Sequence, residues 1–279
     1  MAQKSEKMTK QELRAPDAFQ LYGAEASDWL MKRSQIISTV ATVLVLGGLI
    51  AALVQYFSNR TEERASKQLG QTLEVLERPV VEGDLPLQAP PGEEPPFKTQ
   101  QEKDQAIVKA LGEFRAQNKG TDAAVTAALP LGKAEYRLGN HDGALTAFGE
   151  FIKDAPENDP LLVSAYEGQG YAHEAKGQLD QALEAFKGMA KVEAGDYLQG
   201  MGLYHQARIL VQQGKKDEAA QVLVDLKTSQ ANTASGRLAT ERLAVLAAEG
   251  VKVPEPKTTA PAPAATPAPG APAPAAPQQ

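Results

Sequence analysis

Residues 36–57 form an apolar stretch without a charged side chain, and they read IISTVATVLVLGGLIAALVQYF. As a helix that rises 1.5 Å per residue, this stretch would extend about 33 Å, which matches the hydrocarbon core of a bilayer. A cleavable signal peptide would have a shorter apolar run closer to the N-terminus, and a buried core helix rarely stays uncharged over this length. The stretch therefore predicts a single transmembrane helix in contact with the lipid bilayer.

The residues on either side of this stretch predict its orientation. Cations are more frequent before it than after it: Lys4, Lys7, Lys10, Arg14, Lys32 and Arg33 precede it, and Arg60, Arg64 and Lys67 follow it. Because cations are enriched on the cytoplasmic side of a membrane, we expect residues 1–35 to be a cytoplasmic segment and the rest of the chain to lie outside. Trp29 and Tyr56 would then lie at the two interfaces.

Small side chains within the predicted span would let a second helix approach closely. They are spaced four residues apart in two pairs, Gly47 with Ala51 and Gly48 with Ala52. Such pairs occur at helix contacts in membranes, although Gly and Ala are common in spans generally. This leaves a homo-oligomer through the span or the stalk that follows it as one option.

Composition divides the remaining chain further. Residues 58–78 keep an apolar stripe at helical spacing, formed by Ala65, Leu69, Leu73 and Leu76, and this stripe predicts a helical stalk. Residues 79–99 contain several prolines, whose missing amide donors predict a linker without regular structure. Residues 251–279 are rich in Pro and Ala and have little apolar surface to bury, which predicts a disordered tail.

Residues 100–250 contain an internal repeat. In three segments a glycine is followed five residues later by an alanine and four residues after that by a large apolar residue: Gly139, Ala144 and Phe148; Gly177, Ala182 and Phe186; Gly214, Ala219 and Leu223. The spacing predicts pairs of helices. The glycine would end the first helix in a left-handed conformation, the alanine would lie where the two helices touch, and the large residue would fill the space between repeats.

This spacing resembles the tetratricopeptide repeat. Gly132 and Gly170 also match the glycine in the first helix of that family, and Pro156 matches the proline that closes the second helix. The periods here are 38 and 37 residues in place of about 34, and the large aromatic residue early in the first helix is absent. The resemblance implies an all-α fold, with a single transmembrane helix followed by an α-solenoid of about three degenerate tetratricopeptide repeats.

The order of segments is similar to that of bacterial inner-membrane proteins with a YfgM/CpoB-type tetratricopeptide domain. The run LRAPDAFQ at residues 13–20 is also similar to the opening of such proteins. The resemblance implies a non-enzymatic scaffold with its repeats in the periplasm, which binds subunits of the SecYEG translocon and periplasmic chaperones. A scaffold for cell-envelope assembly or cell division is the alternative, and a membrane-tethered hydrolase is a remote one.

Composition and motifs argue against several other functions. The chain has no cysteine, which excludes thiolate catalysis and Cys-ligated metals, and its net charge of -6 argues against a nucleic-acid partner. His141, His173 and His205 recur at equal spacing, but their places in the repeat should keep them apart, so we predict no metal site. Because the nucleophile elbow, HExxH and glycine-rich phosphate loop are missing, we predict no catalytic or cofactor-binding residues.

The resemblance also implies a binding face. In a tetratricopeptide array the first helix of each repeat lines the concave face, and that register places eight aromatic and charged residues there: Lys133, Tyr136, Arg137, Glu167, Tyr171, Glu174, Tyr204 and Arg208. Exposed aromatic rings beside cations can hold an extended peptide or a helix of a protein partner. We expect these side chains to matter more for partner binding than for the fold.

One specialised form of that face is disfavoured. In this family a set of Lys and Asn side chains, the carboxylate clamp, holds the C-termini of cytosolic chaperones. The sixth positions of the three first helices carry Pro130, Gly168 and His205 in this chain, so the clamp is missing. The sequence therefore argues against a cytosolic Hsp70 or Hsp90 adaptor.

Overall fold

The computed structural model describes residues 22, 27, 29–81, 94–192 and 198–255. Most of the predicted cytoplasmic segment, the middle of the predicted linker and most of the predicted C-terminal tail lie outside these residues.

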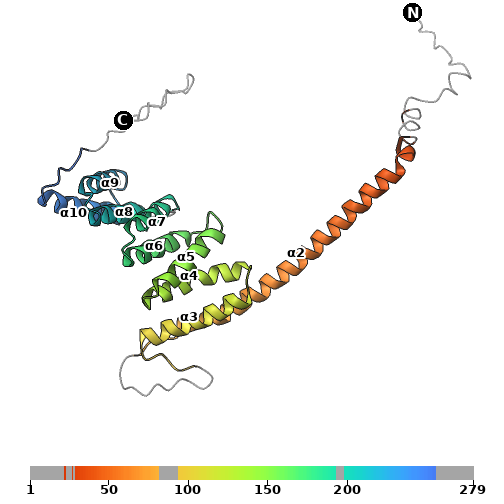
Figure 1. Ribbon diagram of the computed structural model, residues 1–279, viewed down its shortest axis with the longest axis horizontal. Coiled ribbons are helices and arrows are strands. Elements are labelled where there is room, and N and C mark those ends of the chain that lie inside the picture. Colours follow the sequence, from red (N-terminus) through yellow and green to blue (C-terminus); the bar gives the residue numbers. More distant parts are fainter. Residues whose placement is uncertain (1–21, 23–26, 28, 82–93, 193–197, 256–279) are drawn as a thin grey trace, which may run out of the picture. The chain divides into compact units, whose positions relative to one another are not determined.

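The described part of the chain is mainly helical (Figure 1). Its helices are α2 (Ser34–Glu77), α3 (Gln100–Gln117), α4 (Asp122–Arg137), α5 (His141–Asp154), α6 (Leu162–Ala175), α7 (Leu179–Val192), α8 (Met201–Gln212), α9 (Lys216–Ser229) and α10 (Ala234–Ala248). Within the same residues, pairing between extended segments is limited to an isolated parallel bridge between Val80 and Phe97. The predicted all-α fold class, with one apolar helix before a solenoid of helices, is confirmed.

The chain divides into two compact units, residues 1–63 and residues 64–279. In the first unit the apolar side chains of α2 face outward, with Leu44 70% exposed and Phe57 63% exposed. This part of α2 is long and apolar enough to cross a membrane, although a signal sequence near the N-terminus would meet the same criterion. An apolar surface of this extent needs cover from lipid or protein, because soluble proteins rarely leave one open to water.

The second unit is a series of antiparallel helix pairs, α4 with α5, α6 with α7 and α8 with α9, that follow one another in chain order (Figure 1). The first helices of consecutive pairs also meet. Helix α4 contacts α6, hydrogen bonds join α6 to α8, and α8 contacts α10. Helices α4, α6, α8 and α10 therefore form one layer, which we call the first-helix layer.

Side-chain caps fix where several of these helices begin. The hydroxyl oxygen of Thr121 accepts a hydrogen bond from the backbone N–H of Ala124 at 3.1 Å, at the start of α4. Thr99, Asn140 and Thr233 do the same for α3, α5 and α10. Each cap satisfies a backbone donor that has no partner within its own helix, so these residues specify the helix starts locally.

The three predicted turn glycines end the first helices as expected. Gly139, Gly177 and Gly214 have φ values of 79°, 71° and 76°, in the left-handed region that other residues rarely adopt. Each lies directly between the two helices of a pair. The local part of the repeat prediction is therefore confirmed.

Large side chains of the second helices fill the space between repeats. The Phe148 ring is 1% exposed, and a Cβ atom added to Gly132 or Gly168 would lie 2.8 or 2.4 Å from it. Phe186 is fully buried in the same way against Gly170, where an added Cβ would lie 2.5 Å from the ring. The glycines of the first helices therefore provide the room that these rings occupy, as close packing requires.

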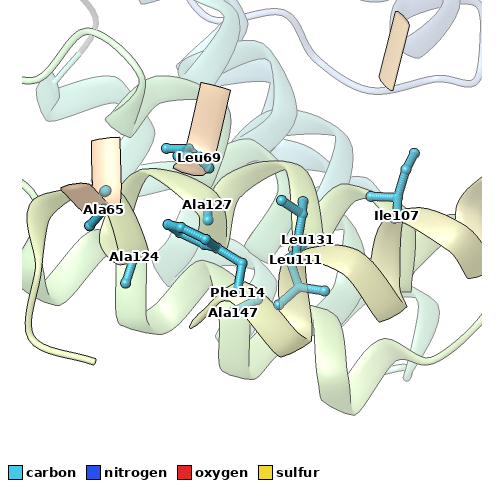
Figure 2. Packing of buried hydrophobic residues seen from close by; sticks show 11 residues of the cluster. Ala65, Leu69, Ile107, Leu111, Phe114, Ala124, Ala127, Leu131 and Ala147 are labelled. Atoms are coloured by element: carbon cyan, nitrogen blue, oxygen red, sulfur yellow. The ribbon is translucent and has the colours of Figure 1, made fainter. Parts of the chain in front are cut away.

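The last turns of α2 belong to the second unit. Ala65 and Leu69 are 0% and 7% exposed, and they share a hydrophobic cluster with Leu111 and Phe114 of α3 (Figure 2). Hydrogen bonds join Gln68 to Gln117 at 3.3 Å and the Lys103 ammonium to the Arg78 carbonyl at 2.7 Å, so the two helices run antiparallel. The end of the predicted stalk thus forms a further helix pair with α3 and covers one side of the helix array.

Both ends of the predicted linker are also held. The backbone N–H of Val81 donates to the Phe97 carbonyl at 2.9 Å, and the Phe97 N–H donates to the Pro79 carbonyl at 3.0 Å. Arg78 pairs with Glu94, and its guanidinium lies 4.0 Å from the centroid of the Phe97 ring. The described ends of this proline-rich segment therefore have more structure than its composition suggests.

The packing of α2 on α3 predicts that Leu69→Ala will destabilise the second unit by about 2 to 5 kcal/mol, because it removes a buried side chain and leaves a cavity. Leu161 is 43% exposed and serves as the control, with an expected change within about 0.5 kcal/mol for Leu161→Ala. Urea unfolding of a soluble fragment of residues 64–255 measures both. Equal stability of the two variants would show that the end of α2 does not cover the array.

Candidate protein-binding face

The eight predicted site residues all lie on the first-helix layer. Lys133, Tyr136 and Arg137 are on α4, Glu167, Tyr171 and Glu174 are on α6, and Tyr204 and Arg208 are on α8. The structure joins residues of α6 and α8 into one network. Arg137 of α4 instead binds Asp104 of α3.

An ion pair between neighbouring repeats is central to that network. The Arg208 guanidinium binds the Glu174 carboxylate through two nitrogens, with Nη2 at 2.7 Å from Oε2. The Gln212 side-chain amide donates to the same carboxylate at 2.6 Å. Arg208 also lies 5.6 Å from the centroid of the Tyr171 ring, a cation–π distance. Arg208 therefore has a fixed position across α6 and α8.

The same contacts set the electrostatics of the network. Burial raises the pKa of the Glu174 carboxyl, but the hydrogen bonds from Arg208 and Gln212 outweigh this effect and hold the pKa below its usual value. Burial, together with the nearby Glu167 carboxylate, raises the pKa of the Tyr171 hydroxyl. Glu174 is therefore ionised and Tyr171 is neutral near neutral pH.

His205 lies at the centre of this network. It is 4% exposed, its ring centroid is 4.8 Å from that of Phe186, and its Nε2 lies 3.3 Å from the Tyr171 hydroxyl and 3.6 Å from Glu167. From the sequence, His205 was predicted not to bind a metal and was noted only at the sixth position of the missing carboxylate clamp. Its position one residue after Tyr204 on α8 was the available signal for a role in packing. We call Glu167, Tyr171, Glu174, Tyr204, His205 and Arg208 the α6–α8 cluster.

Arg137 binds within the fold. Its guanidinium lies 2.6 and 3.0 Å from the Asp104 carboxylate of α3, which is only 2% exposed and also accepts a hydrogen bond from Gln100. Removing one partner of a buried ion pair leaves the other charge without compensation. Arg137 is therefore expected to stabilise the contact between α3 and α4, while its side chain stays 42% exposed on the first-helix layer. Asp104 could not be found from the repeat, because α3 lies outside the three aligned segments.

The other two α4 residues differ in exposure. Lys133 is exposed, and it has no ion-pair partner among the described residues. Tyr136 is half-buried, with its ring centroid 5.4 Å from that of His141. Lys133 is thus the predicted site residue on α4 whose charge is open to a partner.

The three histidines lie on different helices. His141 begins α5, His173 near the end of α6 donates from Nδ1 to the Gln178 side-chain oxygen at 2.8 Å, and His205 is buried on α8. Within the part of the chain that the structure describes, no group of three His, Asp or Glu side chains is placed to hold a metal ion.

A solenoid of antiparallel helix pairs with aromatic and charged side chains across one layer belongs to the class of helical-repeat proteins, which typically serve as scaffolds for other proteins. A family model of the tetratricopeptide repeat matches residues 129–198 and residues 169–231, so this part of the chain is similar to tetratricopeptide repeats. No curated protein matches the chain. The repeats therefore suggest a scaffold for interactions between proteins.

The pKa of Glu174 gives a stability prediction that depends on pH. Because its pKa is lower in the folded chain than the usual 4.5, its ion pair stabilises the fold above about pH 4.5, and this contribution is lost as the pH falls through the lowered value. Glu174→Gln should therefore lower the free energy of unfolding at pH 7 and have a smaller effect at pH 3.

Urea unfolding of the fragment of residues 64–255 at several pH values measures this difference. Glu241→Gln is the control, because Glu241 is exposed on α10 and has no ion-pair partner in the described structure. A Glu174→Gln effect of the same size at pH 3 and pH 7 would rule out the ion pair as its cause.

Proposed function

We propose that this chain is a membrane-anchored scaffold that binds protein partners on the periplasmic side of the bacterial inner membrane, as an ancillary component of the Sec translocon and its chaperones. The observation that carries the binding role is the α6–α8 cluster, which crosses two consecutive repeats on the first-helix layer. The experiment that tests it is partner capture by variants of that layer, described below.

The α6–α8 cluster suits a binding role because its members are held in place before a partner arrives. Tyr171 contacts Phe186, His205 and Arg208, so its ring loses little freedom on binding. Rigid aromatic and arginine side chains contribute much of the energy at protein interfaces, and fixing them in advance lowers the cost of association. The exposed charge of Lys133, one repeat away on the same layer, would extend the contact to α4.

The anchor is supported by the composition and the flanks of α2. Cation–π pairs lie at both ends of the apolar stretch: the Arg33 guanidinium lies 4.8 Å from the Trp29 ring, and that of Arg60 lies 5.3 Å from the Tyr56 ring. Aromatic and cationic side chains are enriched at the two interfaces of a membrane. The excess of cations before residue 36 supports a cytoplasmic N-terminus.

The assignment to the Sec translocon is supported by the resemblance to YfgM/CpoB-type proteins in the order of segments. The alternative partners are the proteins of cell-envelope assembly and cell division. Crosslinking in membranes followed by purification separates them: SecYEG subunits and periplasmic chaperones support the first role, and peptidoglycan synthases support the second.

The proposed topology predicts the result of proteolysis. Protease added to intact spheroplasts should remove the chain beyond about residue 58 and leave a small N-terminal fragment in the membrane. Full resistance in intact spheroplasts, with digestion only after lysis, would place the repeats in the cytoplasm. A secreted chain without an anchor would instead be recovered in the periplasmic fraction, cut after the apolar stretch.

The binding face predicts that Lys133→Glu and Tyr204→Ala will reduce recovery of partners from membranes, because both change the first-helix layer. Lys227→Glu is the control, because Lys227 is an exposed lysine on α9, outside that layer. Phe186→Ala controls for loss of fold and should cost about 3 to 5 kcal/mol of stability.

Two results would contradict this prediction. If both face variants stay folded and recover every partner, the binding face lies elsewhere on the chain. If Tyr204→Ala unfolds the second unit as readily as Phe186→Ala, Tyr204 has a role in packing and its assignment to the face is wrong.

A further inference from the structure

A second surface of the same unit also has the features of a binding site. The end of α2 and the facing side of α3 enclose an open groove of about 1010 Å³, which we call the edge groove. Apolar groups from both helices line it, among them Val75 of α2 and Ala106, Ala110 and Phe114 of α3. Ala106 and Ala110 are one helical turn apart, so they lie on the same face of α3. Their side chains are small, which leaves room for a partner to approach the backbone of α3 closely.

Unpaired negative charge surrounds this apolar lining. Glu74 and Glu77 of α2 and Glu113 of α3 line the groove, are exposed, and form no ion pair among the described residues. Two cations also line it. Arg78 is already paired with Glu94, which leaves Lys109 as the one lining cation without an ion pair in the described structure.

From this combination we propose that the edge groove binds an amphipathic helix of a protein partner, whose apolar stripe lies on Val75, Ala106 and Ala110 and whose lysines or arginines face Glu74, Glu77 and Glu113. Helices are commonly bound in this way, with apolar side chains one turn apart in the groove. Charge complementarity specifies the basic flanks and speeds association.

The same charges argue against a second copy of this chain as the occupant. Two edge grooves brought face to face around a twofold axis would place the glutamates of one copy against those of the other. Like charges at an interface cost free energy, so a self-complementary contact is disfavoured here. The edge groove is also separate from the first-helix layer, because none of its lining residues lies on α4, α6 or α8.

Binding of a designed peptide to the full chain in zwitterionic lipid nanodiscs tests the proposal, with empty nanodiscs as the blank. The probe is a fluorescent helical peptide of 15 residues, with leucines at positions i, i+3, i+4 and i+7 and lysines elsewhere. A matched peptide carries glutamates in place of the lysines. We expect saturable binding of the lysine peptide and no binding of the glutamate peptide.

The triple variant Glu74→Gln, Glu77→Gln and Glu113→Gln should weaken binding of the lysine peptide about tenfold, which corresponds to about 1.4 kcal/mol. The matched control is Glu157→Gln, Glu218→Gln and Glu241→Gln, which makes the same change in net charge at exposed positions outside the groove. This control should bind within twofold of the unchanged chain. Circular dichroism confirms that both variants remain folded.

Several outcomes would overturn the proposal. Equal weakening by the two triple variants would mean that the peptide responds only to net charge. Loss of binding in Tyr204→Ala but not in the groove variant would place the peptide on the first-helix layer. If the chain forms dimers that the groove variant dissociates, and the peptide does not compete with them, the occupant is a second copy. Failure of the edge groove leaves the proposed function of the first-helix layer intact.

Discussion

The helix array depends on the contact between an aromatic ring of one helix and the bare backbone of its neighbours. Phe148 has Gly132 on one side and Gly168 of the next repeat on the other, and a methyl group at either position would overlap its ring. In the third repeat Leu223 takes the place of the ring, and Ala207 occupies the position that corresponds to Gly132. The size of the second-helix residue and the size of the first-helix residue therefore change together, as dense packing between repeats requires.

Much of the fold could be predicted from the sequence because its markers act locally. Gly139 and its two equivalents are needed wherever the backbone adopts a positive φ, so a single position reveals the end of a helix. The apolar stripe with Ala65 and Leu69 similarly predicted that the stalk would be helical, with one apolar side. It could not show what covers that side, because the partner, α3, carries no repeat motif and lies beyond a proline-rich segment. Long-range packing of this kind depends on shape, which periodicity alone does not contain.

The candidate site shows the same division. The repeat register placed Glu174 and Arg208 on one layer, but the register could not show that they bind each other across two repeats. It also assigned Arg137 to the open face, but it could not show that this exposed side chain binds the buried carboxylate of Asp104. A register specifies the direction of a side chain and gives no information about the charges that neighbouring helices bring to it. Both arginines are paired with a carboxylate, whereas Lys133 is exposed and has no ion pair among the described residues.

The contacts of Arg78 indicate where additional residues can be inserted into the chain. Together with the bridge between Val80 and Phe97, its pairing with Glu94 holds the two described ends of the proline-rich segment close together. The two ends are held by their own contacts, so the number of residues between them should have little effect on the free energy of folding. Doubling the length of a loop costs only about 0.6 kcal/mol. A folded reporter domain with adjacent termini could therefore be grafted between these ends, which would give the helix array an internal label while leaving its own termini and its repeat spacing unchanged.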